Sequence, residues 1–223
     1  MFDRIAPTYD LLNHLLSAGR DYSWRRQVTG QLRGREAHRV IDLATGTADL
    51  LISLLRGCPS IKKVVGLDIS ERMLAVGREK LRTRGLAERV ELVCADASAT
   101  PFPAGTFDAA TMAFGIRNTP NPAMTLGEMH RILKPGGLAL ILEFSLPAQR
   151  IVQWCYLKYL RAVVPWIGAA ISGDRDAYRY LDESIEAFYQ PEAFAALMRQ
   201  AGFDAVSVIP LTWGVASIYK GTK

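Results

Sequence analysis

Small and acidic residues follow three short apolar runs of the chain, in positions suited to hold a nucleoside. The first run leads into a loop over 42–49, in which Gly46 lets the backbone approach a ligand and Thr47 offers an amide and a hydroxyl at a helix start. The second ends at Asp68, from which a carboxylate accepts hydrogen bonds from both ribose hydroxyls. The third is followed by Asp96-Ala97, which can read the amino edge of an adenine.

Each of these residues also has an ordinary structural explanation, because strand-end acids often cap turns and Gly46 suits a tight turn. All three groups stand in the same place, just after a predicted strand, and this shared placement favours a nucleoside site. The loop lacks the G-x-G-x-x-G pattern, and Ala48 stands where a second glycine would let a pyrophosphate approach. A cofactor without phosphates is therefore predicted in preference to a dinucleotide. The predicted cofactor contacts are Asp42, Gly46, Thr47, Asp68, Ile69, Asp96, Ala97 and Ala113.

The elements that must position these residues alternate between β-branched runs and helix-length segments. Strands are predicted over 39–44, 63–68, 90–94, 107–114 and 137–144, and helices over 48–57, 70–84, 121–133 and 191–201. Two C-terminal strand-like runs, 204–210 and 213–219, are joined tightly enough to pair antiparallel. The predicted fold is α/β: a Rossmann-like, doubly wound, mostly parallel seven-stranded sheet with an antiparallel C-terminal strand, in a single domain over 1–223.

Local chemistry marks several helix ends. Ser70 precedes a helical pattern and is predicted to cap its first turn. The segment 133–137, Leu-Lys-Pro-Gly-Gly, is predicted to stop a helix, since proline cannot continue one and glycine accepts the left-handed turn. An alanine at position 48 fits this loop if its own backbone already belongs to the helix that follows. Cys94 lies in an apolar strand and is expected to be buried.

Composition and charge limit the location of the protein and the partners it can bind. The chain has a formal net charge of +5, spread along its length without a basic tract, so a solvated surface is the plain explanation and an anionic membrane or substrate the alternative. Three cysteines without close pairing indicate a reducing, cytoplasmic location. The longest strongly apolar run, 163–171, is about half the ~20 residues of a spanning helix, so membrane contact is expected to be peripheral, at the inner face.

Taken together, these stretches resemble the ubiquinone/menaquinone biosynthesis C-methyltransferase family, which includes demethylmenaquinone methyltransferases. The resemblance covers essentially the whole chain, and its specific motifs are P-x-Y-D at 7–10, F-G-I-R-N at 114–118 and Y-L-x-x-S-I-x-x-F at 180–188. It implies S-adenosylmethionine as cofactor, bound by Thr47, Asp68 and Asp96-Ala97. It also implies methyl transfer to a ring carbon of a polyprenylated quinol, with demethylmenaquinol as the expected acceptor. The short start of the chain before P-x-Y-D leaves the closure of an N-terminal lid, over about 1–30, in question.

A quinol ring carbon becomes nucleophilic only when an adjacent hydroxyl loses its proton. Such hydroxyls resemble tyrosine, with a pKa of about 10, so lowering that pKa to neutrality needs about 4 kcal/mol of differential stabilisation. A cation and a hydrogen-bond donor in a dry pocket can supply it. Arg117 and Asn118 are the first candidates, and Tyr9 is a candidate to orient water or the quinol oxygen. The structural alternatives are an ion pair for Arg117 and a packed aromatic ring for Tyr9.

The histidines offer one candidate general base. His14 lies near the predicted lid, whereas His38 and His130 are expected on the surface, far from the strand tips. The sequence shows no metal-binding pattern, and methyl transfer from a sulfonium needs no metal.

An aromatic-rich insertion over about 146–190 carries Trp154, Tyr156, Leu157, Tyr159, Val163 and Trp166 together with Lys158 and Arg161. It fits an apolar tunnel or membrane-facing lid, and equally a helix pair packed on the domain or a homodimer interface. The polyprenyl acceptor favours the tunnel.

Two other functions remain open. One is methylation of another phenolic or lipid acceptor, and the other is a non-catalytic, cofactor-binding role in a quinone-biosynthesis assembly. Nucleic-acid methylation is not expected, because the sequence has neither an N-P-P-Y-type segment nor an added basic domain. Ring type, tail length and oligomeric state are not determined by the sequence.

Overall fold

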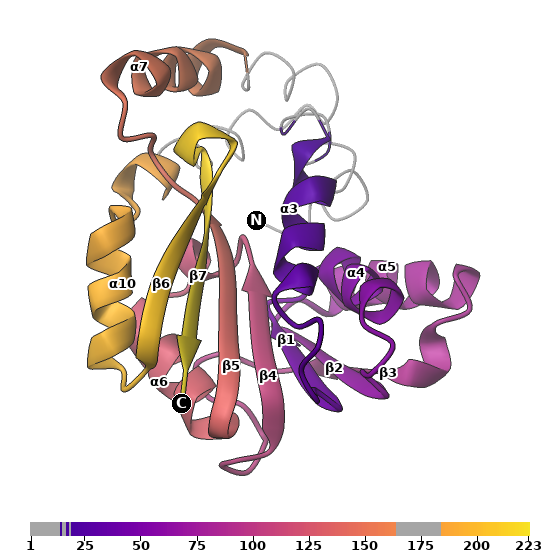
Figure 1. The fold of residues 1–223 in the computed structure, drawn as a ribbon. Coiled ribbons are helices and arrows are strands. Elements are labelled where there is room, and N and C mark those ends of the chain that lie inside the picture. Colours follow the sequence, from indigo (N-terminus) through magenta and orange to yellow (C-terminus); the bar gives the residue numbers. More distant parts are fainter. Residues whose placement is uncertain (1–13, 15–16, 18, 164–183) are drawn as a thin grey trace.

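The computed structural model describes residues 14, 17, 19–163 and 184–223. Its centre is a seven-stranded sheet with the order β3-β2-β1-β4-β5-β7-β6 (Figure 1). The strands are β1 (Arg39–Leu43), β2 (Lys63–Asp68), β3 (Val90–Cys94), β4 (Phe107–Ala113), β5 (Leu133–Phe144), β6 (Asp204–Leu211) and β7 (Ala216–Thr222). Strands β1 to β5 pair in parallel, and β7 runs antiparallel to both β5 and β6. The predicted fold class is confirmed.

Helices cover both faces of this sheet, as a doubly wound fold requires. Figure 1 shows α3 (Arg20–Gly30), α4 (Asp49–Gly57) and α5 (Glu71–Thr83) on one side and α6 (Pro122–Ile132) and α10 (Pro191–Gln200) on the other. Strand β5 shows why: Leu138, Leu140 and Leu142 join the core under α3 and α4, whereas Ala139 and Ile141 join the core under α6 and α10. Side chains alternate along a strand, so an apolar run supplies both cores at once.

Two helices begin at the side-chain caps that their sequences provide. The Ser70 hydroxyl accepts a hydrogen bond from the Met73 amide at 3.2 Å, which confirms the predicted cap of α5. The Asn121 side chain accepts from the amides of Ala123 and Met124 at the start of α6. Helix α6 stops at Ile132, where the stop was expected, but the segment after it already belongs to β5 and pairs at Leu133 with β4.

Two local expectations are wrong. Ala48 is not helical: it is the N-cap of α4 with φ 70°, a left-handed conformation that costs an L-residue roughly 1–2 kcal/mol. Cys94 is exposed, because β3 is the edge strand of the sheet and has no strand beyond it to cover its outer side.

The remaining described elements are the short helical turns η1 (Ala87–Arg89), η2 (Ile116–Asn118) and η4 (Thr212–Gly214), the helix α7 (Arg150–Lys158) and the π-helical turn η3 (Tyr159–Val163) that continues it. Helix α7 lies at the carboxyl end of β5, and Figure 1 shows it standing away from the sheet. None of its side chains is buried. No helix in the described part of the chain is long and apolar enough to cross a membrane.

Candidate functional site

A cavity of about 280 Å³ opens at the carboxyl ends of β1, β2 and β4. It is the place where open α/β sheets bind ligands. The structure brings to its wall seven residues that the sequence singled out: Gly46, Asp68, Ile69, Asp96, Ala97, Ala113 and Asn118. Asp42 and Thr47 line a small adjoining hollow instead. Tyr9 lies outside the described residues.

Asp68 connects the cavity to the loop that follows β1. One carboxylate oxygen accepts from the Gly46 amide at 2.8 Å, and the other accepts from the Ser70 amide at 2.9 Å. Gly46 has φ 56°, and a Cβ built there would meet nothing within 4 Å, so glycine is required by the backbone conformation and leaves the approach to the loop open. Each carboxylate oxygen has a second lone pair, which makes Asp68 a suitable acceptor for two ligand hydroxyls.

Asp42 supports the loop from inside the sheet. Its carboxylate is fully buried and accepts from the hydroxyls of Thr45 and Thr111, both at 2.7 Å. Burial raises the pKa of Asp42 to about 7, against the hydrogen bonds from the two threonines, which lower it. Direct contact of Asp42 with a cofactor stays a prediction.

The burial of Asp42 predicts how the stability of the fold depends on pH. Between pH ~4 and pH ~7 the folded protein holds a proton on Asp42 that the unfolded chain has lost, so stability falls as pH rises and levels off above pH 7. Asp42→Asn is expected to remove a decline of roughly 2–3 kcal/mol between pH 5 and pH 7. Urea unfolding of both proteins across this range measures it, and parallel stability profiles would contradict the assignment.

Thr47 is buried at the start of α4, where its hydroxyl accepts from Lys80 Nζ of α5 at 3.2 Å. Lys80 also forms an ion pair with Asp49. A single lysine thus ties the loop after β1 to a neighbouring helix, so Thr47 is held at the site by contacts that its position in the sequence does not reveal.

Arg25 is a residue of this region that the sequence did not single out. It is buried on α3, lines the hollow beside Gly46 and Thr47, and forms an ion pair with Asp21. Its guanidinium also lies 4.0 Å from Asp49. The i, i+4 spacing of Asp21 and Arg25 indicates an ordinary helix pair, so only the packing of α3 on α4 shows that the arginine reaches the loop.

Asp96 and Ala97 lie at the tip of the third strand, as expected. One oxygen of Asp96 accepts from both the amide and the hydroxyl of Ser98 at 2.8 Å. This turn fixes the carboxylate at the cavity wall, and Ala97 is buried beside it.

Arg117 forms the ion pair that the sequence left open as its alternative role. Its Nη1 donates to Glu143 at 2.5 Å and to the carbonyl of Phe114 at 3.0 Å, and its Nε donates to Ser184 at 3.4 Å. The side chains of Arg117 and Glu143 are only 6% and 0% exposed. Asn118 is on the cavity wall and donates to the same Phe114 carbonyl at 3.2 Å.

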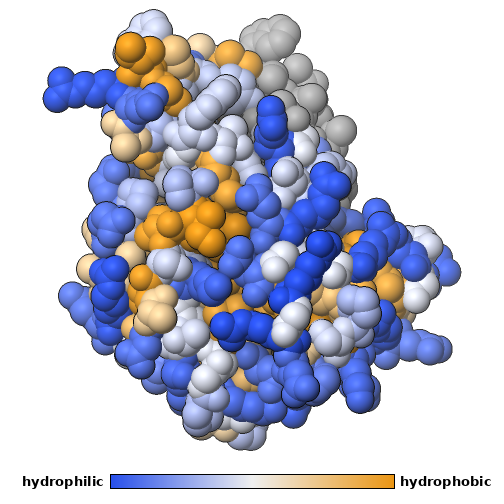
Figure 2. Space-filling view, viewed as in Figure 1, coloured by the Kyte–Doolittle hydropathy of each residue, from blue (hydrophilic) through white to orange (hydrophobic). Residues whose placement is uncertain are grey.

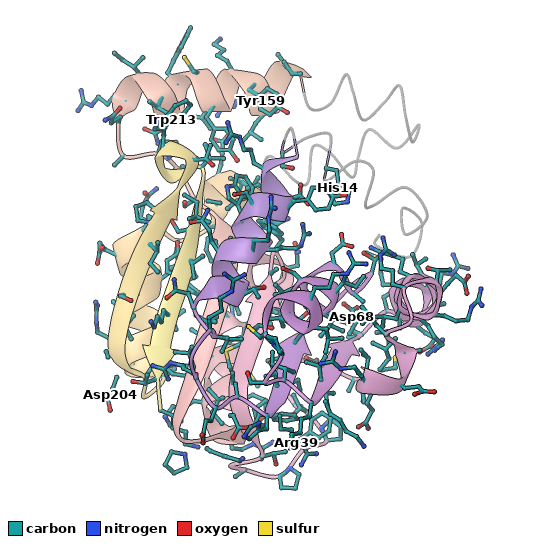
Figure 3. All side chains as sticks on the ribbon, turned by 45° about the vertical axis from the view of Figure 1, so that its right-hand side comes forward. His14, Arg39, Asp68, Tyr159, Asp204 and Trp213 are labelled. Atoms are coloured by element: carbon teal, nitrogen blue, oxygen red, sulfur yellow. The ribbon has the colours of Figure 1, made fainter. Side chains whose placement is uncertain are left out.

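The histidines are distributed differently from the expectation. His14 is half-buried, lies 2.6 Å from Asp21, and stacks on Tyr22; Figure 3 shows it at the same end of the sheet as Asp68. His38 is exposed, as expected. His130 is less exposed than expected: it is half-buried edge-on against Phe203, and burial lowers its pKa. The described residues contain no group of side chains that would hold a metal ion.

Comparison with known proteins places this chain in a family. The model of the ubiE/COQ5 methyltransferase family matches residues 1–223. The chain is 47% identical over 223 residues to the demethylmenaquinone methyltransferase of Thermus thermophilus, with 100% of both chains covered. It is 45% identical to the ubiquinone/menaquinone biosynthesis C-methyltransferase UbiE of Geobacter sulfurreducens, covering 100% of this chain and 87% of that protein.

Solved structures agree with the fold. A SAM-dependent methyltransferase of Thermotoga maritima superposes with a TM-score of 0.69 at 21% identity, covering 100% of this chain and 98% of that one. The [4+2]-cyclase SpnF superposes with a TM-score of 0.72 at 18% identity, covering 100% and 94%. These likenesses show the fold alone, since one fold supports different reactions. The match to the family model runs over the whole chain, and on that basis the protein belongs to the ubiE/COQ5 methyltransferase family.

Proposed function

We propose that the protein transfers the methyl group of S-adenosylmethionine to a ring carbon of a polyprenylated quinol, with demethylmenaquinol as its substrate. The observation that carries this proposal is the match to the Thermus demethylmenaquinone methyltransferase along the full length of both chains. The Geobacter relative is named for both ubiquinone and menaquinone biosynthesis, so the ring type is the part of the proposal that most needs an experiment.

The cavity fits the nucleoside part of this cofactor. Asp68 presents two carboxylate oxygens that are already fixed by amides of the protein, and Asp96 lies across the cavity at the next strand tip. The loop that follows β1 does not carry the glycines needed to wrap a pyrophosphate, which suits a cofactor without phosphates. When bound, S-adenosylmethionine supplies an electrophilic methyl group on a sulfonium.

The hollow that adjoins the cavity fits the amino-acid end of the cofactor. It is lined by Arg25, Gly46 and Thr47, and a buried guanidinium is the protein group best matched to a carboxylate. Asp21 and Asp49 lie close to Arg25, so the site remains near neutrality when an ammonium and a carboxylate enter it together.

Arg25→Met tests this placement with two ligands. S-adenosylhomocysteine has the amino-acid end, and 5′-methylthioadenosine lacks it. The variant is expected to bind the first about tenfold or more weakly and the second as the wild type does, because a charged hydrogen bond contributes about 1.5–3 kcal/mol. Calorimetry measures both affinities, and Arg25→Lys should recover part of the loss. An equal loss for both ligands would mean that Arg25 only holds the fold.

At the acceptor, the chain must favour the phenolate of the quinol. Asn118 offers an amide on the cavity wall. We assign to the same oxygen Arg117, which precedes Asn118 but is not among the residues that line the cavity, and Tyr9. The hydrogen bonds of Arg117 use Nε and Nη1, and no described residue accepts from Nη2, which is therefore the atom assigned to the acceptor. Glu143 offsets much of the charge of Arg117, so the guanidinium acts chiefly as an oriented donor and leaves proton removal to another group.

Incubation with labelled S-adenosylmethionine and a panel of reduced benzoquinones and naphthoquinones tests the reaction. We expect the label to appear in the ring of demethylmenaquinol. The other quinols should be poorer substrates. Label in a non-quinol phenol or lipid alone would replace the proposed acceptor. Cofactor binding without any transfer would favour the non-catalytic role.

We also propose that the protein meets its substrate at a membrane surface through α7. Ile151 and Trp154 of this helix are 80% and 62% exposed. The described stretch 146–163 contains no acidic residue and carries the cations Arg150, Lys158 and Arg161, of which Arg161 is ion-paired with Glu186. Trp213, 83% exposed, lies at the same end of the molecule in Figure 3. Aromatic and apolar side chains with flanking cations are typical of helices that lie in an anionic interface.

Vesicle sedimentation tests this surface. Binding to phosphatidylglycerol vesicles is expected to weaken as salt rises, because the cations contribute through screened electrostatics. Trp154→Ser with Ile151→Ser should reduce binding several-fold, whereas Met124→Ser, at an exposed position on α6, should leave it unchanged. If these two substitutions disrupt a dimer and leave vesicle binding unchanged, α7 belongs to a homodimer interface.

A further inference from the structure

A second and larger cavity, of about 790 Å³, lies between α3, α4 and α5, and we call it the arginine groove. Each helix contributes residues at the spacing of one helical face. Tyr22, Arg26 and Thr29 come from α3, Ile52 and Arg56 from α4, and Arg84 follows α5. Residues three and four apart lie on the same side of a helix, so these faces meet around one hollow. Figure 2 shows hydrophilic side chains gathered over these helices.

The arginine groove is strongly basic. Six of its lining residues are Arg or Lys and one is Asp. Arg25 pairs with Asp21 and Lys80 pairs with Asp49, at the end nearest the loop after β1, which leaves four positive charges uncompensated within the described part of the chain. Because the formal net charge of the whole chain is +5, most of the excess charge of the protein is concentrated in this groove.

Four arginines of the groove are exposed and lack a carboxylate partner among the described residues: Arg26, Arg33, Arg56 and Arg84. Arg33 donates to the carbonyl of Gly57 at 3.3 Å, and Arg84 donates to the carbonyl of Lys80 at 3.2 Å. These bonds orient the guanidinium groups but do not neutralise them. A concave surface lined by one sign of charge focuses its field on a ligand of the opposite sign.

The far end of the arginine groove is separate from the cofactor site. Helix α4 starts at Asp49, beside the loop after β1, and ends eight residues further along at Gly57. Its axis therefore spans about 12 Å. Arg56 and Gly57 are at its far end, where Arg33 also lies. A ligand held there does not compete with the nucleoside.

We propose that the arginine groove binds a ligand that carries two or more phosphate groups. A guanidinium matches a phosphate with paired hydrogen bonds, so arginine is the residue expected where planar recognition of phosphate is needed. Guanidinium groups that have no carboxylate partner in the described part of the chain lie on three walls, and together they exceed what one phosphate can contact. The volume is in the range of small-molecule sites. The phosphates belong either to a soluble diphosphate or to lipid headgroups.

Calorimetry and thermal unfolding with inorganic pyrophosphate and tripolyphosphate test the soluble source. Saturable binding, a raised melting temperature and an affinity that falls with salt are expected. Arg33→Gln with Arg56→Gln should weaken binding about tenfold or more. The matched control is Arg72→Gln with Arg199→Gln, two exposed arginines outside the groove, which loses the same charge and should bind normally. Unchanged affinity for S-adenosylhomocysteine would show that both variants are folded.

Phosphatidylglycerol vesicles test the lipid source with the same two double variants. Vesicle binding that the groove variant weakens and the control variant does not, without pyrophosphate binding, would assign the phosphates to lipid headgroups. The proposal is overturned if pyrophosphate and tripolyphosphate do not bind and the groove variant binds vesicles as the wild type does, since vesicle binding would then come from α7 alone. It is also overturned if both double variants lose binding equally, because the charge of the groove would then have no specific role.

Discussion

Arg117→Leu is expected to lower turnover about a hundred- to a thousand-fold, the loss typical of removing a donor to a developing oxyanion. The structure adds a second expected effect, because Leu at 117 leaves the carboxylate of Glu143 buried without its partner. Breaking a buried ion pair on one side typically costs about 3–5 kcal/mol of stability. Turnover measured at saturating S-adenosylmethionine, together with urea unfolding, records both.

Arg117→Leu with Glu143→Leu separates the two effects. Removing both charges relieves the unpaired carboxylate, so the double variant is expected to recover most of the stability. Turnover should stay low if the guanidinium acts on the quinol, and its residual activity should rise more steeply toward alkaline pH than in the wild type, because more quinol is then ionised in solution. Recovery of turnover with stability would reduce Arg117 to a structural ion pair.

Asp68→Ala is expected to weaken binding of S-adenosylhomocysteine about a hundredfold. Loss of a charged acceptor for the ribose hydroxyls contributes about 1.5–3 kcal/mol. The substitution also releases the Gly46 amide, which Asp68 holds at 2.8 Å, so the loop after β1 loses part of its fixed shape. Both effects weaken binding of the same ligand, so we expect a loss of affinity at the upper end of this range.

Calorimetry against a matched control checks this prediction. Asp204→Ala removes an exposed carboxylate at the opposite end of the sheet, where Figure 3 shows it far from Asp68, and should leave the affinity unchanged. Asp68→Asn keeps an acceptor oxygen and should fall between the wild type and Asp68→Ala. Wild-type affinity in Asp68→Ala would remove this residue from the cofactor site.

Much of the architecture follows from local sequence. The bounds of β2 and β3 agree with the prediction, those of β1, β4 and α4 differ by one residue at one end, and those of α5 differ by one residue at each end. Apolar runs must be buried between two helical layers, and residues such as Ser70 mark helix starts through hydrogen bonds within one turn. The same rules place Gly46, Asp68 and Asp96 at the tips of adjacent strands, so most of the wall of this cavity was predictable.

The partners of charged side chains were decided by tertiary structure. Arg117 and Glu143 are 26 residues apart, and they meet because β4 and β5 are neighbours in the sheet. Arg25 reaches the loop after β1, and four exposed arginines line one groove, because α3 packs on α4. Local patterns record the face on which a residue lies, through the period of a helix or strand. They do not record which distant element will cover that face, and the covering element determines whether an arginine forms a buried ion pair or lines a hollow.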